Sequence, residues 1–208
     1  MKAIDRILER IQDLSKKCID QYGYFNLGVT GGRSTKEIYS NLERLSADFS
    51  KWRVILLDER WVDENHPDSN SNQIRHTFFK LPGFVKESFI SFHYGGPHPK
   101  MKEAEKKLQL LEKCHLSLIG VGEDGHICGL FPQNFDKDSE VESLCIVTEN
   151  SPKPPSHRIS VSYSFLFKSD QNFILLFGDK KRHLMEKKGR YPFSLLRHNS
   201  RNTLYTDF

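Results

Sequence analysis

Residues 116–132 read Leu-Ser-Leu-Ile-Gly-Val-Gly-Glu-Asp-Gly-His-Ile-Cys-Gly-Leu-Phe-Pro. An apolar run typical of a buried strand ends at Gly120 and Gly122, which let the backbone turn sharply and a ligand approach the main chain. The turn that follows carries Asp124 and His126. Polar groups at the end of a buried strand are where open α/β sheets bind ligands. A lone histidine in a turn is nevertheless more often a structural residue that caps the next helix, so its interpretation depends on the rest of the chain.

Length and composition favour one domain of moderate size. The chain has 208 residues, which suits a single compact domain spanning residues 1–208. A chain of this length buries roughly 70% of its unfolded surface, so it requires neither disulfides nor a structural metal. The four cysteines are scattered, without a Cys-x-x-Cys pair. Their spacing argues against a zinc site or a disulfide framework and favours a reducing compartment.

Charge and hydropathy argue against a nucleic-acid-binding protein and against a membrane protein. The formal net charge is +4, and the basic residues are spread along the chain. The densest basic stretch, residues 180–190, is typical of a solvated helix face rather than of the continuous basic face that binds nucleic acid. A modestly basic protein suits an anionic small substrate. No signal peptide is recognised, and no apolar run reaches the ~20 residues of a membrane span. We therefore expect a cytoplasmic protein that binds neither nucleic acid nor membrane.

Segments of helix type and strand type alternate along the chain. Their apolar spacing predicts helices at 3–21, 36–45, 70–79, 102–114, 179–188 and 192–196, and strands at 24–29, 52–57, 89–92, 116–119, 144–147, 158–162, 173–177 and 202–206. Residues 133–142 are expected to be polar and irregular. This alternation predicts an α/β fold with a doubly wound, mostly parallel sheet flanked by helices.

Four polar loops are expected to meet at one edge of that sheet. Each of the segments Thr30–Thr35, Asp58–Arg60, Glu123–His126 and Gly178–Lys181 directly follows an apolar strand. Loops that follow parallel strands emerge along the same edge, so these four should converge on one cleft.

The first of these loops suits an anion. Gly31 and Gly32 can present backbone N–H groups to a phosphate, and the guanidinium of Arg33 matches phosphate oxygens. Paired glycines are also common in plain turns. Arg158 and Lys181 are further candidate cations, although each, taken singly, is as easily explained as solvated surface.

The third loop suits proton transfer. His126 can take and return a proton at neutral pH, and Asp124 can orient its ring. Arg60 can form a surface salt bridge or, at a strand end, steady a developing oxyanion. The chain has no Gly-x-Ser-x-Gly elbow, and no cysteine sits beside a histidine in the way that a catalytic nucleophile requires, so a covalent acyl-enzyme is not indicated. A general base that activates water beside a phosphate anchor fits better.

Together these segments resemble the 6-phosphogluconolactonase family, whose superfamily also holds glucosamine-6-phosphate deaminase. The resemblance covers the chain from about Tyr24 to the C-terminus and rests on linked motifs: Thr-Gly-Gly-Arg-Ser-Thr at 30–35, Asp-Glu-Arg-Trp-Val at 58–62 with His-Pro-Asp-Ser-Asn at 66–70, Gly-Val-Gly-Glu-Asp-Gly-His at 120–126 with Leu-Phe-Pro at 130–132, Lys-Pro-Pro and Arg-Ile-Ser within 153–160, and Gly-x-x-Lys at 178–181.

The resemblance implies a Rossmann-like fold of the deaminase type and hydrolysis of 6-phospho-D-glucono-1,5-lactone to 6-phospho-D-gluconate, in the oxidative pentose phosphate pathway. It implies His126 as the general acid/base, with no obligatory metal or organic cofactor. The catalytic set is then His126, Asp124 and Arg60, and the substrate-binding set is Gly31, Gly32, Arg33, Ser34, Asp58, Arg158 and Lys181. The partner is a small sugar-phosphate lactone, and we expect a monomer or weak homodimer.

The sequence departs from the family pattern in three places. Arg33 and Thr35 stand where the commoner loop has Ser and Pro, and Arg182 replaces a usual small residue. These changes bear on substrate affinity more than on reaction type. A deaminase-like enzyme is one alternative, although that group favours Phe-Asn-Glu-Pro where this chain has Gly-Leu-Phe-Pro at 129–132. A non-catalytic sugar-phosphate sensor is the other, and such a protein would typically have lost the histidine.

Overall fold

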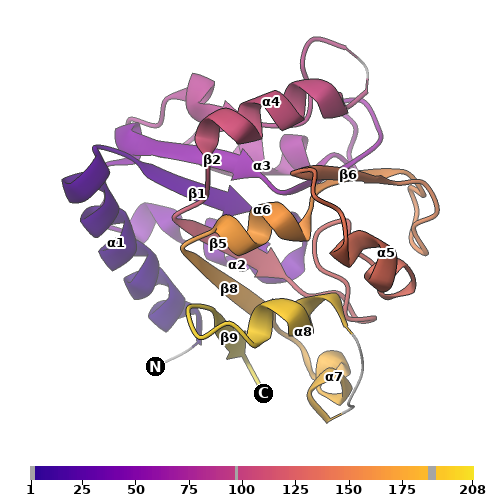
Figure 1. Cartoon of the computed structure of the whole chain (residues 1–208). Coiled ribbons are helices and arrows are strands. Elements are labelled where there is room, and N and C mark those ends of the chain that lie inside the picture. Colours follow the sequence, from indigo (N-terminus) through magenta and orange to yellow (C-terminus); the bar gives the residue numbers. More distant parts are fainter. Residues whose placement is uncertain (1–2, 97, 187–190) are drawn as a thin grey trace.

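The protein is built around a six-stranded parallel sheet. The structure is a computed structural model that describes residues 3–96, 98–186 and 191–208. Within them the strand order is β4-β2-β1-β5-β8-β9, and every pairing is parallel (Figure 1). The strands are β1 (Phe25–Val29), β2 (Trp52–Leu56), β4 (Phe89–Ile90), β5 (Leu116–Gly120), β8 (Gln171–Leu176) and β9 (Thr203–Thr206). The predicted doubly wound, mostly parallel α/β fold is confirmed.

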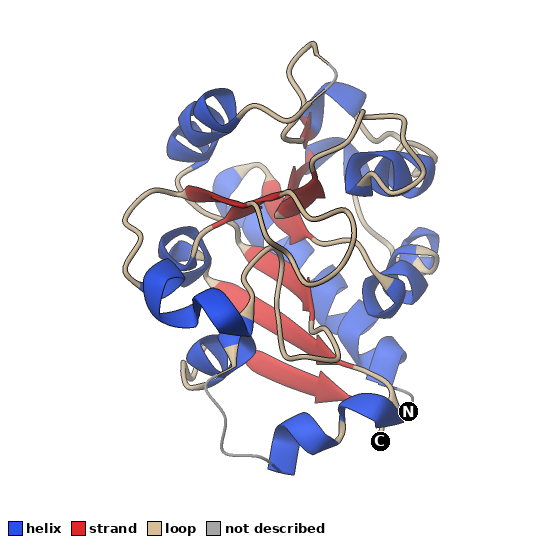
Figure 2. Cartoon of the chain, turned by 90° about the vertical axis from the view of Figure 1, so that its right-hand side faces the viewer, coloured by secondary structure: helices blue, strands red, loops and turns tan. Residues whose placement is uncertain are grey.

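Helices cover both faces of this sheet (Figure 2). They are α1 (Ala3–Tyr22), α2 (Arg33–Tyr39), α3 (Asn70–Phe78), α4 (Met101–Leu111), α5 (Phe135–Ser139), α6 (Tyr163–Lys168), α7 (His183–Glu186) and α8 (Pro192–Arg197). The central strands are buried on both sides, as near-continuous apolar runs require; all five residues of β1 are buried. In α1, Ile7, Leu8, Ile11 and Cys18 form the buried stripe. No helix among the described residues is long and apolar enough to cross a membrane.

A second, smaller sheet lies beyond the carboxyl ends of the first. Its strands are antiparallel in the order β3-β7-β6: β3 (Asp58–Arg60), β7 (Arg158–Val161) and β6 (Cys145–Thr148). The sequence predicted β3 as the start of a loop, which is wrong. Its three charged residues carry little strand propensity, and it forms a strand because β7, about a hundred residues later, pairs with it.

Several helix boundaries also differ from the predictions. Helix α2 begins at Arg33 and ends at Tyr39, after which Leu42–Arg44 form a separate 3-10 turn. The single helix predicted at 179–188 is a 3-10 turn at Asp179–Lys181 followed by α7, and its expected end lies outside the described residues. The segment expected to be irregular contains the short helix α5, and α6 was not predicted at all. Such short elements owe their stability to packing on the sheets rather than to their own propensity.

The strand order fixes where a ligand can bind. From β1 the chain proceeds outward to β2 and β4, and it then returns to place β5 on the other side of β1. The loops after β1 and β5 therefore leave the sheet in opposite directions and open a crevice between them. The first of these loops contains Gly31 and Gly32, and the second contains His126.

Candidate active site

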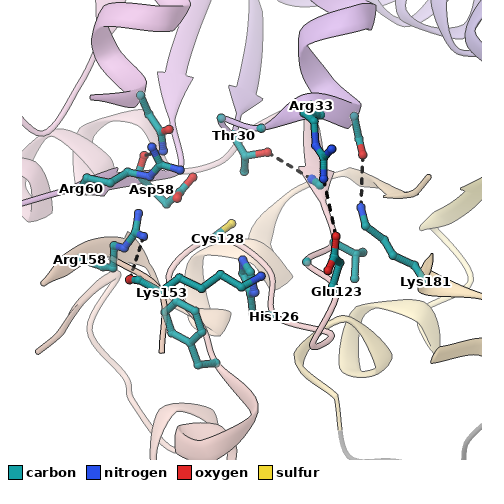
Figure 3. A pocket seen from close by; sticks show the side chains of 18 residues that line it. Thr30, Arg33, Asp58, Arg60, Glu123, His126, Cys128, Lys153, Arg158 and Lys181 are labelled. Carbon is teal, nitrogen blue, oxygen red and sulfur yellow. Dashed lines mark hydrogen bonds and ion pairs between the residues drawn. The ribbon is translucent and has the colours of Figure 1, made fainter. Parts of the chain in front are cut away.

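The four predicted loops line one cavity of about 250 Å³ at the carboxyl edge of the parallel sheet (Figure 3). All ten residues predicted for the site except Asp124 are among those that line it, and Asp124 touches His126 from behind. The remaining described lining residues are Thr30, Asn70, Gly120, Val121, Gly122, Glu123, Cys128, Phe131 and Lys153.

Hydrogen bonds from side-chain hydroxyl groups fix the backbone of the loop after β1. Tyr39 Oη donates to the carbonyl oxygen of Thr30 at 2.9 Å and accepts from the Thr30 N–H at 3.2 Å. Thr35 Oγ1 lies 3.0 Å from the same carbonyl and 3.1 Å from that of Gly32. The Thr30 hydroxyl in turn joins β5, accepting from the Gly120 N–H at 3.2 Å. Thr35, which replaces the usual proline, thus supplies hydrogen bonds that hold the loop in place of a rigid ring.

Both glycines of this loop are required, Gly31 by its surroundings and Gly32 by its backbone conformation. A Cβ on Gly31 would lie 2.0 Å from Asn70 Oδ1, so the loop backbone packs directly against that amide. Gly32 has φ of 111°, a conformation that other residues rarely adopt. The Asn70 side chain is fully buried and donates from Nδ2 to the carbonyl oxygen of Asp58 at 3.0 Å. Asn70 therefore joins the loop after β1 to strand β3.

The turn after β5 presents a histidine paired with a carboxylate. His126 Nδ1 makes a short hydrogen bond with Asp124 Oδ1, and the imidazole packs 4.8 Å from the Phe131 ring. Lys153 Nζ lies 3.9 Å from the same carboxylate oxygen. Burial alone would raise the pKa of Asp124, but the hydrogen bond and positive charge of His126, together with Lys153, outweigh it and lower that pKa to about 2. Asp124 is therefore ionised at neutral pH and keeps the imidazole in one orientation.

The opposite wall carries a buried acid between two arginines. Arg60 and Arg158 are direct partners in the β3–β7 pairing, and Asp58, at the start of β3, is buried. Burial raises the pKa of Asp58, while the charges of Arg60 and Arg158 oppose that rise. Arg158 is itself buried, and burial and Arg60 lower its pKa. The Nη2 atom of Arg158 donates to the carbonyl oxygens of Lys153 and Pro154 at 3.3 and 3.1 Å.

A fully buried glutamate fixes this wall to α3. Glu59 accepts from the N–H groups of Asn70 and Ser71, both at 2.7 Å, and from the Ser69 hydroxyl at 3.0 Å. His93 Nε2 lies 3.7 Å from the same carboxylate. Burial would raise the pKa of Glu59, but the nearby His93 imidazole and the hydrogen bonds from Ser71 and Asn70 hold it below its usual value. Glu59 therefore positions its neighbours Asp58 and Arg60 without facing the cavity.

A second group of cations lies on the other side. Lys181 Nζ approaches Ser34 Oγ at 3.5 Å, and burial, followed by the charge of Arg33, lowers the pKa of Lys181. Arg33 is 95% exposed and pairs with Glu123 at 3.6 Å. The large side chain of Arg33 thus extends over the cavity mouth and does not fill the interior.

His126 lies between these two groups of cations (Figure 3). Arg60 and Arg158 are on one side of it, and Arg33 and Lys181 are on the other. Arg158 lies beside Arg60 because the two are paired across the small sheet.

Three side chains that sequence reasoning did not assign to the site stand out. Asn70, Phe131 and Lys153 all line the cavity. Each lies within a motif that carried the family resemblance, so the signal was present as a pattern. The direction of each side chain depends on tertiary packing, which the pattern does not contain. Among the described residues no group of three or more His, Cys, Asp or Glu is placed to hold a metal ion.

Comparison with known proteins defines the family. The family model for glucosamine-6-phosphate isomerases/6-phosphogluconolactonase matches residues 1–205. The chain belongs to the glucosamine-6-phosphate isomerase/6-phosphogluconolactonase family. Within this family it is 30% identical to a 6-phosphogluconolactonase of Borreliella burgdorferi over 185 residues, covering 86% of this chain and 78% of the relative. It is 26% identical to a 6-phosphogluconolactonase of Helicobacter pylori over 204 residues, covering 91% and 84%.

Solved structures of the glucosamine-6-phosphate isomerase/6-phosphogluconolactonase family share the fold. A 6-phosphogluconolactonase from Shewanella baltica superposes with a TM-score of 0.85 at 22% identity, covering 98% of this chain and 91% of the other. A 6-phosphogluconolactonase from Thermotoga maritima superposes with a TM-score of 0.84 at 20% identity, covering 98% of this chain and 94% of the other.

Proposed function

We propose that this chain is a 6-phosphogluconolactonase, which hydrolyses 6-phospho-D-glucono-1,5-lactone to 6-phospho-D-gluconate. The observation that carries the proposal is the His126–Asp124 pair, held at the end of β5 between two groups of cations. Membership of the family and the named relatives support the same reaction.

The acid/base is His126. Its Nδ1 is engaged by the ionised Asp124, so Nε2 is the nitrogen left for proton transfer. Nε2 takes a proton from water as the water oxygen attacks the lactone carbonyl carbon. When the bond from that carbon to the ring oxygen breaks, Nε2 returns the proton to the leaving oxygen, which becomes the 5-hydroxyl. The product leaves as the free acid and loses its proton to solvent. Lys153, close to Asp124, keeps that carboxylate ionised through the cycle.

The two groups of cations divide the substrate between them. The amides of Gly31 and Gly32 lie on the side of Ser34 and Lys181, which suits the 6-phosphate. Arg60 and the buried Arg158 lie at the other side, where their guanidinium groups would steady a developing oxyanion. Asp58 between them offers a carboxyl group to a sugar hydroxyl.

A direct assay tests the reaction. Lactone hydrolysis, corrected for the spontaneous rate, is measured for the wild type and for His126→Ala. General acid–base catalysis contributes ~10²–10⁴-fold, so the variant should lose that factor while its circular dichroism spectrum stays unchanged. Near-normal turnover by the variant would remove His126 from the mechanism. Release of ammonium from glucosamine 6-phosphate, measured alongside, would instead favour a deaminase, and sugar-phosphate binding without turnover would favour a sensor.

The proposal also covers the setting of the reaction. It places the protein in the cytoplasm, in the oxidative pentose phosphate pathway, acting on a small sugar phosphate without a cofactor. It further takes the chain to be a monomer or weak homodimer, which sedimentation over a range of protein concentrations would test.

A further inference from the structure

A second cavity lies behind the loop that follows β1. It also has a volume of about 250 Å³ and lies between α2 and α3, open to solvent on one side. Gly31 and Gly32 line both this rear cavity and the candidate active site, so the loop is a wall that the two cavities share. Nothing in the proposed lactonase reaction uses the rear cavity.

The walls of the rear cavity suit an apolar body that carries one negative charge. Tyr39 and Ile74 are buried and form its apolar floor. Lys36 and His76 lie exposed at its rim, and of the described residues that line it none is acidic. His76 Nδ1 donates to the carbonyl oxygen of Asn72 at 2.7 Å, so a neutral His76 offers only the acceptor Nε2 at the rim and Lys36 is the group that can contact a carboxylate. Lys36 makes no ion pair with another described residue, so its ammonium group is available to an anion.

The rear cavity is joined to the candidate active site by hydrogen bonds. The Tyr39 hydroxyl, at the rear, binds both the N–H and the carbonyl group of Thr30, which lines the active-site cavity. Thr35 lines the rear cavity and binds the carbonyl groups of Thr30 and Gly32. A ligand that moves the Tyr39 ring or Thr35 therefore moves the backbone that presents N–H groups to a phosphate.

We propose that the rear cavity is a second binding site, for a small organic carboxylate with an aromatic or branched apolar body, and that its occupancy changes phosphate affinity at the loop after β1. The apolar body packs on Tyr39 and Ile74, and the carboxylate meets Lys36. The effect on phosphate affinity rests on the proposed function of that loop, whereas binding at the rear does not.

Nuclear magnetic resonance spectroscopy tests binding without reference to activity. The ¹⁵N-labelled protein is titrated with benzoate, and with benzyl alcohol as the uncharged probe of similar shape. We expect saturable shifts at α2 and α3 with millimolar benzoate, and binding of benzyl alcohol at least about tenfold weaker, because the alcohol has no charge to pair with the Lys36 ammonium group. Absence of saturable shifts at these helices would overturn the site.

Three variants separate the rear cavity from the cationic active site. Thr77→Phe fills the rear cavity and should abolish binding of both probes. Lys36→Gln should bring benzoate down to the level of benzyl alcohol and leaves the cavity open, so it keeps the test decisive if Thr77→Phe does not fold. Lys80→Gln, an exposed charge outside the cavity, is the matched control and should change neither. Shifts that survive Lys36→Gln unchanged would contradict the proposed carboxylate contact.

Titration with inorganic phosphate tests the coupling. Saturating benzoate should change the apparent phosphate affinity of the wild type at least twofold and leave that of Lys36→Gln nearly unchanged. Equal phosphate affinity with and without benzoate would refute the coupling. Phosphate binding is measured here without turnover, so an inactive lactonase would not affect the outcome.

Discussion

Replacing Gly122 by alanine should displace His126, the proposed acid/base, without removing it. A Cβ at this position would lie 2.1 Å from His126 Cε1 and 2.2 Å from its Nδ1. Gly122 is not among the residues with positive φ, so the backbone accepts alanine. The strain therefore falls on the imidazole, which must move by more than about 1 Å to restore carbon contacts of ~3.5 Å. That movement breaks its hydrogen bond with Asp124.

The size of the effect follows from this displacement. A misplacement of about 1 Å at a reacting group costs ~10²-fold in rate, which is about 2.7 kcal/mol at ~1.36 kcal/mol per tenfold. Stability should change far less. Gly→Ala at a compatible position contributes about 0.4–1 kcal/mol by restricting the unfolded chain, and this offsets part of the lost hydrogen bond to Asp124. We expect kcat to fall at least ~10²-fold while Tm moves by only a few degrees.

The assay is lactone hydrolysis with thermal unfolding measured on the same preparations. Gly96→Ala is the matched control, because its Cβ would meet only the Lys100 side chain, at 3.5 Å, and its φ is ordinary. It should keep full activity. If Gly122→Ala retains more than about a tenth of wild-type turnover while His126→Ala is inactive, the ring does not occupy the position described and the reasoning fails.

Three further predictions concern charged groups. The pKa of Asp124 is about 2, below its unfolded value, so its contribution to stability is present above about pH 4 and is lost as pH falls towards 2; urea unfolding from pH 5 to 2 should show the gap between wild type and Asp124→Asn closing. Burial raises the pKa of Asp138 to about 6, so wild-type stability should decline as pH rises from about 4 to above 6. Asp138→Asn should lack that decline and be the more stable protein at pH 8. The measurement is the difference in unfolding free energy between wild type and variant at pH 5 and at pH 8. Equal differences at the two pH values would contradict the prediction. Lys181→Ala should raise KM for the lactone roughly tenfold with little change in kcat, since it removes a charge-assisted contact worth roughly 1.5–3 kcal/mol; a fall in kcat at unchanged KM would place Lys181 at the reacting carbon instead.

The outline of the fold could be predicted from the sequence because it depends on patterns within short segments of the chain. Long apolar runs such as 52–57 and 173–177 are buried strands, and helical periodicity at 3–21 marks α1. The alternation of strands and helices predicted the parallel sheet. The parallel sheet in turn predicted that the loops after β1 and β5 meet at one edge. His126 could be assigned to the site because it lies in the turn that follows β5.

What could not be predicted depends on contacts between distant segments. Strand β3 is charged and forms only because β7 pairs with it, so the neighbourhood of Arg60 and Arg158 was invisible in the sequence. Asn70 reaches the cavity because the buried carboxylate of Glu59 holds the start of α3 against β3. A pattern can mark such residues as belonging to a motif, but it does not state which way their side chains point.

The small antiparallel sheet fixes the spacing of two positive charges. Arg60 and Arg158 are opposite each other in its register, so backbone hydrogen bonding, rather than two flexible side chains, sets the spacing of the pair. Successive residues of a strand face opposite ways, so a slip of one residue would turn a cation away from the cavity and break the match between the two arginines. A single residue added inside β3 or β7 should therefore separate the two guanidinium groups and lower activity. These seven strand residues are held to a fixed count.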